Sequence, residues 1–550
     1  MPRHVPHLIL TVALSLASPR AARADGVPIG PVPTEPQMRP SVSADGSGRA
    51  TVSFKTASLR VGAVHVSATG VPDGGFSFGP MSLPLALEPN EPLRAAATSD
   101  SQLLIVGDHA AATAPVLTCV RNGGNAIAGF PVALALPLRH PAMVRGLAGR
   151  TLLVAKDADA VSFWTLRGAI VAADGQVEFA VQLSSPVQFF DEDAIDACSD
   201  GHGGLIAAMP YYGQISTGSK DLGVWRLAAD GSRPWGNQPV PIVNAFGDQT
   251  DVHVVPDGAG GMLLVWTDPR AGTRSLDIFA MRLDGDAFSV PGWPTSGRPV
   301  CDALGAQSRP RITADGTGGV WIAWLDQRAS VEGDLRYSHL LGDGELAPGF
   351  TTDGSPLCMA GGAQGEAALA GDGAGGCFIV WRDDRSGSSD IYAQHVSATG
   401  QLAAGWPADG RALTTAAGAQ DQPAMASVSG GKAVVAWRDA RAGTARIYAT
   451  GIADAATTDA PPSLPAGLRL APLPAAGQSP RVRLSLPAGG PGVLQLLDVG
   501  GRERARIDLT GPLSEQQVTL APGGSLEPGL YFARLRQGRA SVCVRIPLVR

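Results

Sequence analysis

The sequence has few aromatic residues, few charged residues and no long hydrophobic run after its first two dozen residues. Aromatic residues make up 5% and charged residues 17% of its 550 positions, and the net charge is −6. A chain without a basic excess has no electrostatic means of recruiting nucleic acid. No later stretch approaches the roughly 18 apolar residues that a transmembrane helix needs, so no membrane span is predicted in the mature chain.

Cysteine is also scarce, and its spacing argues against a disulfide framework. The six cysteines form no close-spaced pattern, and a domain of this size buries enough core to fold without cross-links. Cys301 and Cys358 occupy the same place in adjacent repeats, which predicts a packing role. Should one pair be oxidised, Cys358 and Cys377 are the expected partners, because their strands belong to neighbouring units.

The familiar signatures of catalysis and cofactor binding are missing. The sequence has no Gly-x-Ser-x-Gly elbow, no phosphate-binding glycine loop and no dinucleotide fingerprint. His202 and His253 lack the spacing of a zinc pair. The acidic run 191–196 suggests a solvated loop rather than the two separated carboxylates of a glycosidase. We therefore predict no catalytic, cofactor-binding or metal-binding residue and no cofactor.

What the sequence does contain is a repeated motif, Trp-x-Asp-x-Arg, in four copies. The steps from one Trp to the next are 58, 57 and 56 residues. A regular period in this range indicates stacked structural units. The copies are Trp266, Asp268 and Arg270; Trp324, Asp326 and Arg328; Trp381, Asp383 and Arg385; and Trp437, Asp439 and Arg441.

Each repeat has the residue pattern expected of four short antiparallel strands. A turn such as 315–319 (Asp-Gly-Thr-Gly-Gly) precedes the motif strand, and a segment such as 390–393 (Asp-Ile-Tyr-Ala) follows it. Asp-Gly turns of this kind predict a hairpin turn with glycine in the left-handed, positive-φ conformation. A calcium loop is less favoured, because the acidic ligands of an EF-hand are missing. Four strands per unit predict the blades of a β-propeller over 25–453. About eight blades are expected, with seven as the alternative, and 27–36 is expected to supply the missing strand of the last blade.

The repetition itself argues that the motif is structural. Alternate residues of a strand share a face, so Trp, Asp and Arg should lie on one side of the strand. We expect the Trp to pack between blades and the Asp and Arg to form a charge-assisted pair that holds the following hairpin. A ring of ligand-binding Asp or Arg side chains is the competing interpretation. Conservation of the triplet in every copy favours the structural one.

These repeats resemble those of the periplasmic Tol-system propeller and related WD-like blades. They are more similar still to long-period repeats of secreted bacterial propellers that carry Trp-x-Asp-x-Arg and Asp-Ile-Tyr-Ala. The resemblance covers roughly 36–453 and is strongest over 248–453. It implies an exported propeller.

Both ends of the chain depart from the repeat. Residues 1–24 have a basic start, a short apolar core and a small-residue site, which predict a signal peptide cleaved between Ala24 and Asp25. Residues 454–467 lack periodicity and predict a linker. Alternating strands over 468–550 predict a small antiparallel β-sandwich of immunoglobulin-like type. The predicted location is therefore extracellular or on the outer surface of a bacterium.

The C-terminal segment resembles the sorting domains of type IX-secreted proteins and the immunoglobulin-like domain of flagellar hook-capping proteins. The resemblance rests on 528–531 (Pro-Gly-Leu-Tyr), 498–502 (Asp-Val-Gly-Gly-Arg) and a basic final strand. Arg545 and Arg550 stand in that strand where lysine is usual. The resemblance implies secretion or surface attachment through this segment, with the secretion machinery as a partner.

Two functions remain open at this point. The first is a non-catalytic exported propeller that binds or scaffolds an extracellular polymer or protein. The second is a propeller hydrolase or lyase that acts on extracellular glycans. The low aromatic content favours the first, because several of the ten Trp belong to the repeat and few remain for sugar stacking.

Overall fold

The computed structural model describes most of the chain in two separate units. The described residues are 25–29, 33–44, 48–81, 94–99, 102–106, 116–121, 132–133, 138–157, 165–172, 174, 176–186, 194–212, 219–243, 245–270, 276–453, 469–476, 479–486, 492–498, 503–510, 513–520, 526, 529–537 and 540–548. The chain divides into Met1–Ala456 and Thr457–Arg550. The predicted signal peptide and linker lie outside the described residues. Among those that are described, no helix is long and apolar enough to cross a bilayer.

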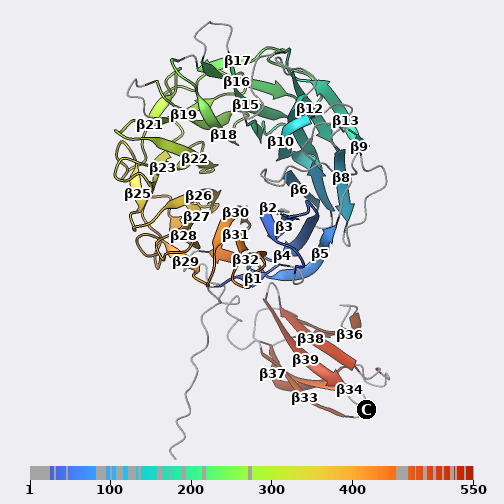
Figure 1. Cartoon of the computed structure of the whole chain (residues 1–550). Coiled ribbons are helices and arrows are strands. Elements are labelled where there is room, and N and C mark those ends of the chain that lie inside the picture. The colour runs from blue at the N-terminus through green and yellow to red at the C-terminus, as the bar shows by residue number, and fades with distance from the viewer. Residues whose placement is uncertain are drawn as a thin grey trace, which may run out of the picture. The chain divides into compact units, whose positions relative to one another are not determined.

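The first unit is a β-propeller of eight four-stranded antiparallel sheets arranged around a central channel (Figure 1). We number these blades 1 to 8 in chain order. Blades 1 to 3 consist of β2 (Gln37–Ala44), β3 (Ala50–Thr56), β4 (Val61–Val66) and β5 (Pro72–Met81); β6 (Arg94–Ser99), β7 (Gln102–Val106), β8 (Val116–Arg121) and β9 (Val132–Ala133); and β10 (Leu138–Arg145), β11 (Thr151–Asp157), β12 (Thr165–Val171) and β13 (Val177–Gln182).

Blades 4 to 7 repeat this order most regularly. They consist of β14 (Asp196–Ser199), β15 (Leu205–Tyr212), β16 (Lys220–Leu227) and β17 (Val240–Val243); β18 (Thr250–Pro256), β19 (Met262–Asp268), β20 (Asp277–Leu283) and β21 (Arg298–Cys301); β22 (Gln307–Ala314), β23 (Val320–Asp326), β24 (Asp334–Leu340) and β25 (Ser355–Cys358); and β26 (Gln364–Gly371), β27 (Cys377–Asp383), β28 (Asp390–Val396) and β29 (Arg411–Thr414). The first strand of each blade faces the channel and the last lies at the rim (Figure 1). The prediction of a β-propeller of about eight blades is confirmed.

Blade 8 closes the ring by combining the two ends of the propeller. It contains β30 (Gln420–Val428), β31 (Lys432–Asp439) and β32 (Arg446–Ala453), and its outer strand is β1 (Val27–Pro28). Val27 pairs with Ala449 and Pro28 with Tyr448. The N–H of Ile29 then donates to the Ile447 carbonyl at 2.8 Å. An otherwise open edge of β32 is thereby paired.

The hydrophobic core of the propeller lies between adjacent blades. Every residue of β19 and β23 is buried, because the sheets on both sides cover both faces of these strands. One cluster joins blades 4 and 5 and includes Val224 and Trp266. Another joins blade 8 to blade 1, with Val434 packed in the same cluster as Val52. The ring is therefore closed by packing as well as by strand pairing.

The second unit is a small β-sandwich. Its two antiparallel sheets are β33 (Arg469–Ala476), β34 (Ser479–Leu486) and β37 (Leu513–Thr519), and β36 (Glu503–Leu509), β35 (Gly492–Asp498), β38 (Gly529–Gln537) and β39 (Ala540–Leu548). Leu484 from one sheet and Leu496 and Leu535 from the other belong to one fully buried cluster. This agrees with the predicted antiparallel sandwich.

Candidate functional site

The repeated motif forms a closed set of contacts inside each of blades 5 to 8. In blade 5, the Trp266 indole N–H donates to the Asp268 carboxylate at 2.8 Å. The same carboxylate accepts the backbone N–H of Arg270 at 2.9 Å and its guanidinium Nε–H at 2.8 Å. Trp266 and Asp268 are fully buried. The strand ends at Asp268, so Arg270 lies in the turn just beyond it and not on the strand with Trp266 and Asp268 as expected.

The other three copies repeat this geometry. The Trp Nε1 to Asp Oδ2 distances are 3.1, 2.8 and 3.0 Å for Trp324–Asp326, Trp381–Asp383 and Trp437–Asp439. Each of these Asp residues also accepts hydrogen bonds from its own Arg: Arg328, Arg385 and Arg441. Burial alone would raise the pKa of Asp383, but the hydrogen bonds from Arg385 and Trp381 lower it below its ordinary value. The motif side chains are thus bonded to one another and do not project toward a ligand.

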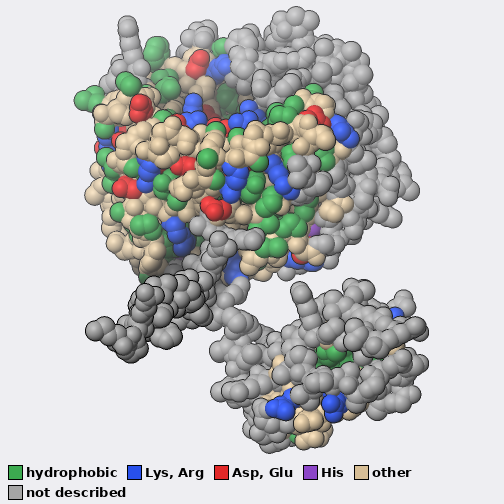
Figure 2. Space-filling model, turned by 60° about the horizontal axis from the view of Figure 1, so that its bottom comes forward, with side chains coloured by type: hydrophobic (Ala, Val, Ile, Leu, Met, Phe, Trp, Pro, Cys, Tyr) green, Lys and Arg blue, Asp and Glu red, His purple; other side chains and the backbone are tan. Residues whose placement is uncertain are grey.

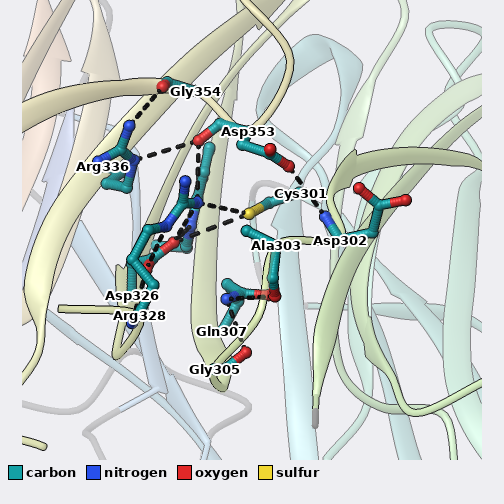
Figure 3. Close-up of polar contacts among 11 residues, drawn as sticks. Cys301, Asp302, Ala303, Gly305, Gln307, Asp326, Arg328, Arg336, Asp353 and Gly354 are labelled. Carbon is teal, nitrogen blue, oxygen red and sulfur yellow. Dashed lines mark hydrogen bonds and ion pairs between the residues drawn. The ribbon is translucent and has the colours of Figure 1, made fainter. Parts of the chain in front are cut away.

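The motif arginine also connects neighbouring blades. Arg328 Nη2 of blade 6 donates to the Cys301 sulfur of blade 5 at 2.9 Å and to the Asp353 carbonyl at 3.1 Å (Figure 3). Arg336 donates to the same carbonyl at 3.1 Å. Arg385 and Cys358 repeat the thiol contact one blade further on, also at 2.9 Å. Cys301 and Cys358 therefore contact the motif of the next blade.

The thiols that the structure describes are free. Cys198, Cys301, Cys358 and Cys377 are buried and form no disulfide, so the expected pairing of Cys358 with Cys377 is not made. Burial raises the pKa of Cys301 and of Cys358 to about 12. A thiol that stays protonated at neutral pH is a poor nucleophile and a poor metal ligand. The side chains of Cys119 and Cys543 lie outside what the structure describes.

The Asp-Gly turns at the opposite ends of the blades are capped hairpins. In the 315–319 turn, one oxygen of Asp315 accepts the N–H groups of Thr317 and Gly319 at 2.7 and 2.9 Å. Gly316 and Gly318 have φ of 81° and 95°, which favours glycine. The other oxygen of Asp315 lies 2.9 Å from His339 Nε2. Burial would raise the pKa of Asp315, but these hydrogen bonds lower it to about 2.

A buried glutamine at the start of the innermost strand is a repeat element that the sequence analysis missed. Its Nε2 donates to the carbonyl two residues earlier at 2.7 to 2.8 Å in four blades. The glutamines occur at the period of the motif, which is the signal that would have found them. They are Gln37, Gln249, Gln307, Gln364 and Gln420.

Two residues after each glutamine, the innermost strand bulges and adopts a positive φ at a residue other than glycine. The five φ values are 52°, 50°, 54°, 53° and 54°. Such conformations cost about 1–3 kcal/mol each and concentrate at functional sites. We call these residues the bulge ring: Arg39, Asp251, Arg309, Glu366 and Gln422.

Hydrogen bonds link consecutive members of the bulge ring. The N–H of Arg39 in blade 1 donates to the Gln422 side-chain oxygen in blade 8 at 2.7 Å. The N–H of Gln422 in turn donates to the Glu366 carboxylate in blade 7 at 2.7 Å. The strained backbone is therefore held by side chains of the neighbouring blade.

A charged cluster from blades 4, 5 and 6 lies beside the bulge ring. His253 is bracketed by two carboxylates, with Nδ1 3.3 Å from Asp196 and Nε2 3.2 Å from Asp251. Arg311 Nη1 lies 3.6 Å from Asp251 and 2.6 Å from His253 Nε2. Burial would lower the pKa of His253, but its two carboxylate partners raise it. Burial would raise the pKa values of Asp196 and Asp251, but their contacts to His253 lower both.

The position of Asp196 corrects the interpretation of the acidic run. Asp196 is the first residue of β14, and its carboxylate accepts the Val254 N–H at 3.0 Å. It therefore belongs to a channel strand and not to a solvated loop. Residues 191–193 of the same run lie outside the described residues.

Part of the bulge ring and part of the charged cluster line a cavity of about 590 Å³ in the central channel. Arg39, Glu366 and Gln422 of the bulge ring line it together with Asp196 and Arg311. The remaining lining is largely aliphatic, and none of the described lining residues is aromatic. Within the described ranges no three His, Cys, Asp or Glu side chains are placed to hold a metal ion. The channel is the candidate functional site because polar side chains from several blades converge there.

On the face of the propeller in Figure 2, basic and acidic side chains are interspersed among neutral ones. No single-sign patch covers the described part of this face. The outer surface in view therefore offers no electrostatic alternative to the channel.

No protein-family model and no curated protein matches the sequence. Among solved structures, a lectin from Burkholderia pseudomallei is 13% identical, with 66% of this chain and 97% of the lectin covered and a TM-score of 0.38. An α-L-arabinofuranosidase from Fusarium graminearum is 8% identical, with 57% and 93% covered and a TM-score of 0.31. A PQQ-bound aldose sugar dehydrogenase from Streptomyces coelicolor is 13% identical, with 58% and 96% covered and a TM-score of 0.31.

Similarities this weak carry no argument about ligands or catalysis. The class of the protein follows from its own strand pairing, which is that of an eight-bladed β-propeller followed by a small β-sandwich.

Proposed function

We propose that this chain is an exported, non-catalytic binding protein whose ligand site is the central channel of the propeller. The observation that carries the proposal is that the channel's charged groups already contact one another and still leave space for a ligand. Its paired carboxylates, Asp196 and Asp251, are already bonded to His253, while a cavity of about 590 Å³ remains between the strands. Such a site has room for a ligand and converging polar groups to orient it.

A glycan hydrolase or lyase is the second candidate, and the convergence of two carboxylates with His253 favours it. General acid catalysis at neutral pH, however, requires a carboxyl group whose pKa is raised. The pKa values of Asp196 and Asp251 are lowered by their contacts to His253, although burial opposes this. The pair is therefore poorly suited to deliver a proton, and binding is the better-supported function.

The C-terminal sandwich belongs to the same proposal as the part that serves secretion or surface attachment. What supports this role is the resemblance of its strand pattern to sorting domains together with its separate hydrophobic core. In this arrangement the propeller binds an extracellular polymer or protein, and the sandwich brings it to or holds it at the outer cell surface.

The test is to obstruct the channel and to compare binding. Ala424 of β30 lines the cavity, and Ala424→Trp would fill part of it. Ala442 is exposed in a turn of the same blade, so Ala442→Trp is the matched control. Full-length protein is titrated with defined oligosaccharides and short peptides, and release of shortened products is followed in the same samples. We expect binding that Ala424→Trp abolishes and Ala442→Trp retains, without product release. Product release that is lost with Asp196→Asn would establish the enzyme instead.

A further inference from the structure

Two arginines of the bulge ring have guanidinium groups that make no contact with the protein's own acceptors. Arg39 and Arg309 occupy the same position in β2 and β22, two residues after the buried glutamine. Arg39 is half-buried and lines the cavity, whereas Arg309 is exposed and is not among the residues that line it. In the portion of the chain that the structure describes, neither guanidinium has a hydrogen bond or an ion pair.

The acidic members of the bulge ring, in contrast, each have one carboxylate oxygen in contact with the protein. Glu366 accepts the Gln422 N–H at 2.7 Å, and Asp251 lies 3.2 Å from His253 Nε2. Arg311, the other arginine of the channel, donates to the Pro310 carbonyl at 2.7 Å and lies beside Asp251. Among the described residues that line the cavity, Arg39 therefore has an uncommitted, always-charged guanidinium group, and such groups bind carboxylates and other oxyanions in a forked geometry.

Next to the bulge ring runs a belt of half-exposed aliphatic side chains. They stand five residues after the glutamine in four of the channel strands and all line the cavity: Val42, Ile312, Leu369 and Met425. Water gains little from contact with such a wall, so an aliphatic group that covers it is stabilised by roughly 25 cal/mol per Å² buried. Sugars bind instead by stacking on aromatic faces, and the described lining has none.

We infer that the channel ligand carries a carboxylate on an aliphatic body, the carboxylate bound by Arg39 and the aliphatic part packed on the belt. This inference rests on the proposed function, since it names the ligand class of the same site. The C-terminal end of a peptide with aliphatic side chains and a medium-chain fatty acid share this chemistry. A cavity of about 590 Å³ lies within the usual size range of a small-ligand site.

The experiment compares each carboxylate with a neutral partner of the same shape. Octanoate is paired with octanol, and an acetylated Ala-Val-Leu peptide with a free carboxylate is paired with its amide. Trigalacturonate serves as a carboxylate without an aliphatic body. Binding to the full-length protein is measured by calorimetry at low and at moderate salt. We expect one carboxylate of the two aliphatic pairs to bind at least tenfold more tightly than its neutral partner, with a preference that decreases as salt increases.

Substitutions of the two arginines test the assignment of the site. Gln422 already holds this position in blade 8 with φ of 54°, so Arg39→Gln and Arg309→Gln keep a side chain that the bulge accepts. Arg39→Gln should reduce carboxylate binding about tenfold and leave the neutral partner's affinity unchanged. Arg309→Gln makes the same change at an arginine that does not line the cavity, and it should leave both affinities unchanged. A second control is Arg506→Gln, an exposed arginine of the sandwich whose side chain is 51% accessible.

The outcomes separate this inference from the proposed function. Equal affinity for carboxylate and neutral partner, or carboxylate binding that survives Arg39→Gln, overturns the carboxylate assignment. If Ala424→Trp still abolishes that binding, the channel remains the ligand site. Tighter binding of trigalacturonate than of either aliphatic probe overturns the aliphatic part of the inference. Binding of the aliphatic carboxylates that Ala424→Trp leaves unchanged overturns both the inference and the channel site.

Discussion

A single aspartate in each motif copy accepts hydrogen bonds from several donors at once. Asp383 accepts the Trp381 indole N–H at 2.8 Å, the Arg385 backbone N–H at 3.0 Å and the Arg385 guanidinium. Arg385 in turn reaches the Asp409 carbonyl at 2.8 Å. One carboxylate thereby orients a buried indole, caps a turn and ties two loops together, so repetition of the triplet is explained by packing without a ligand.

Replacement of that aspartate should be costly. In Asp383→Ala, the Trp381 N–H and the Arg385 guanidinium lose their acceptor while they remain buried or partly buried. We expect the free energy of unfolding to fall by about 1–3 kcal/mol. Asp384→Ala, next in sequence, removes a half-exposed carboxylate 3.4 Å from Arg382 and should cost less than about 0.5 kcal/mol. Equal melting temperatures for the two variants would show that the motif pair has no stabilising role.

A second buried aspartate, the first residue of the third strand of blade 5, differs from the motif aspartates because no described residue donates a hydrogen bond to it. Asp277 is 1% exposed, and neither of its carboxylate oxygens has a hydrogen-bond partner among the described residues. Burial, with the neighbouring Asp302, Asp268 and Asp353, raises its pKa from 3.8 to about 6. Burial also raises the pKa of Asp221 and of Asp390, which hold the same position in blades 4 and 7. Asp390 begins the repeated Asp-Ile-Tyr-Ala segment, but its burial was not predicted, because an aspartate that opens a β-strand looks like an ordinary turn residue in the sequence.

The raised pKa of Asp277 determines in which direction the stability of the fold changes with pH. Between pH 4 and 6 the unfolded chain releases this proton while the folded chain retains it, so stability falls as pH rises through this window. Asp277→Asn removes the effect. We expect the variant to gain up to about 2 kcal/mol relative to the wild type between pH 4 and pH 7.5, measured by denaturant unfolding at each pH.

The control for that measurement is Asp286→Asn, which changes an exposed carboxylate in the next turn of the same blade. Its difference from the wild type should be independent of pH. A pH-independent difference for Asp277→Asn as well would contradict the raised pKa.

At the scale of elements, sequence periodicity predicted most of the strands that the structure contains. The Asp-Gly turns and motif strands located blades 5 to 8 because glycine and buried apolar runs leave a direct signature. The strand β1 was expected within 27–36 and is found at Val27–Pro28. The earlier blades were harder to delimit because their motif positions hold other residues, such as Phe54 and Thr56, which pair at the register of Trp and Asp.

The channel was not predicted, and the reason is physical. Its bulges place Arg39, Glu366 and similar residues at positive φ, a conformation for which arginine and glutamate carry no sequence preference. A weak signal was present, since Gln-x-x-Pro recurs at 37–40, 307–310 and 420–423. The cluster around His253 was beyond prediction, because its members come from three consecutive blades and meet only when those blades pack against one another.

Ring closure gives a prediction at this scale. Deletion of Asp25–Ile29 removes β1 and the Asp25 carbonyl that accepts a hydrogen bond from Arg441 at 2.9 Å. The edge of β32 is then exposed, and we expect a lower melting temperature and association detected by light scattering. Val27→Thr keeps the backbone pairing and should stay monodisperse. A deletion variant as stable and as monodisperse as the wild type would show that β1 is not needed for closure.

At the scale of the whole molecule, the two units have separate cores and are joined by a segment predicted to be a linker. The propeller buries its apolar residues between blades, whereas the sandwich buries a cluster of its own that includes Val482 and Tyr531. A unit with its own core folds alone when few contacts cross its boundary. Export and attachment are therefore predicted to be separable from ligand binding.

That separation is tested by expressing residues 25–456 without the sandwich. We expect a folded propeller with the same affinity for the channel probes, because every channel strand lies within Met1–Ala456. In the native bacterium, the chain truncated after residue 456 should remain in the periplasm, while the full chain reaches the medium or the outer surface. A truncated propeller that is secreted normally would refute the sorting role of the sandwich. A truncated propeller that fails to fold would show instead that the ring depends on the sandwich. The sorting role would then be tested in the full chain with a substitution that destabilises the sandwich, such as Leu496→Asp.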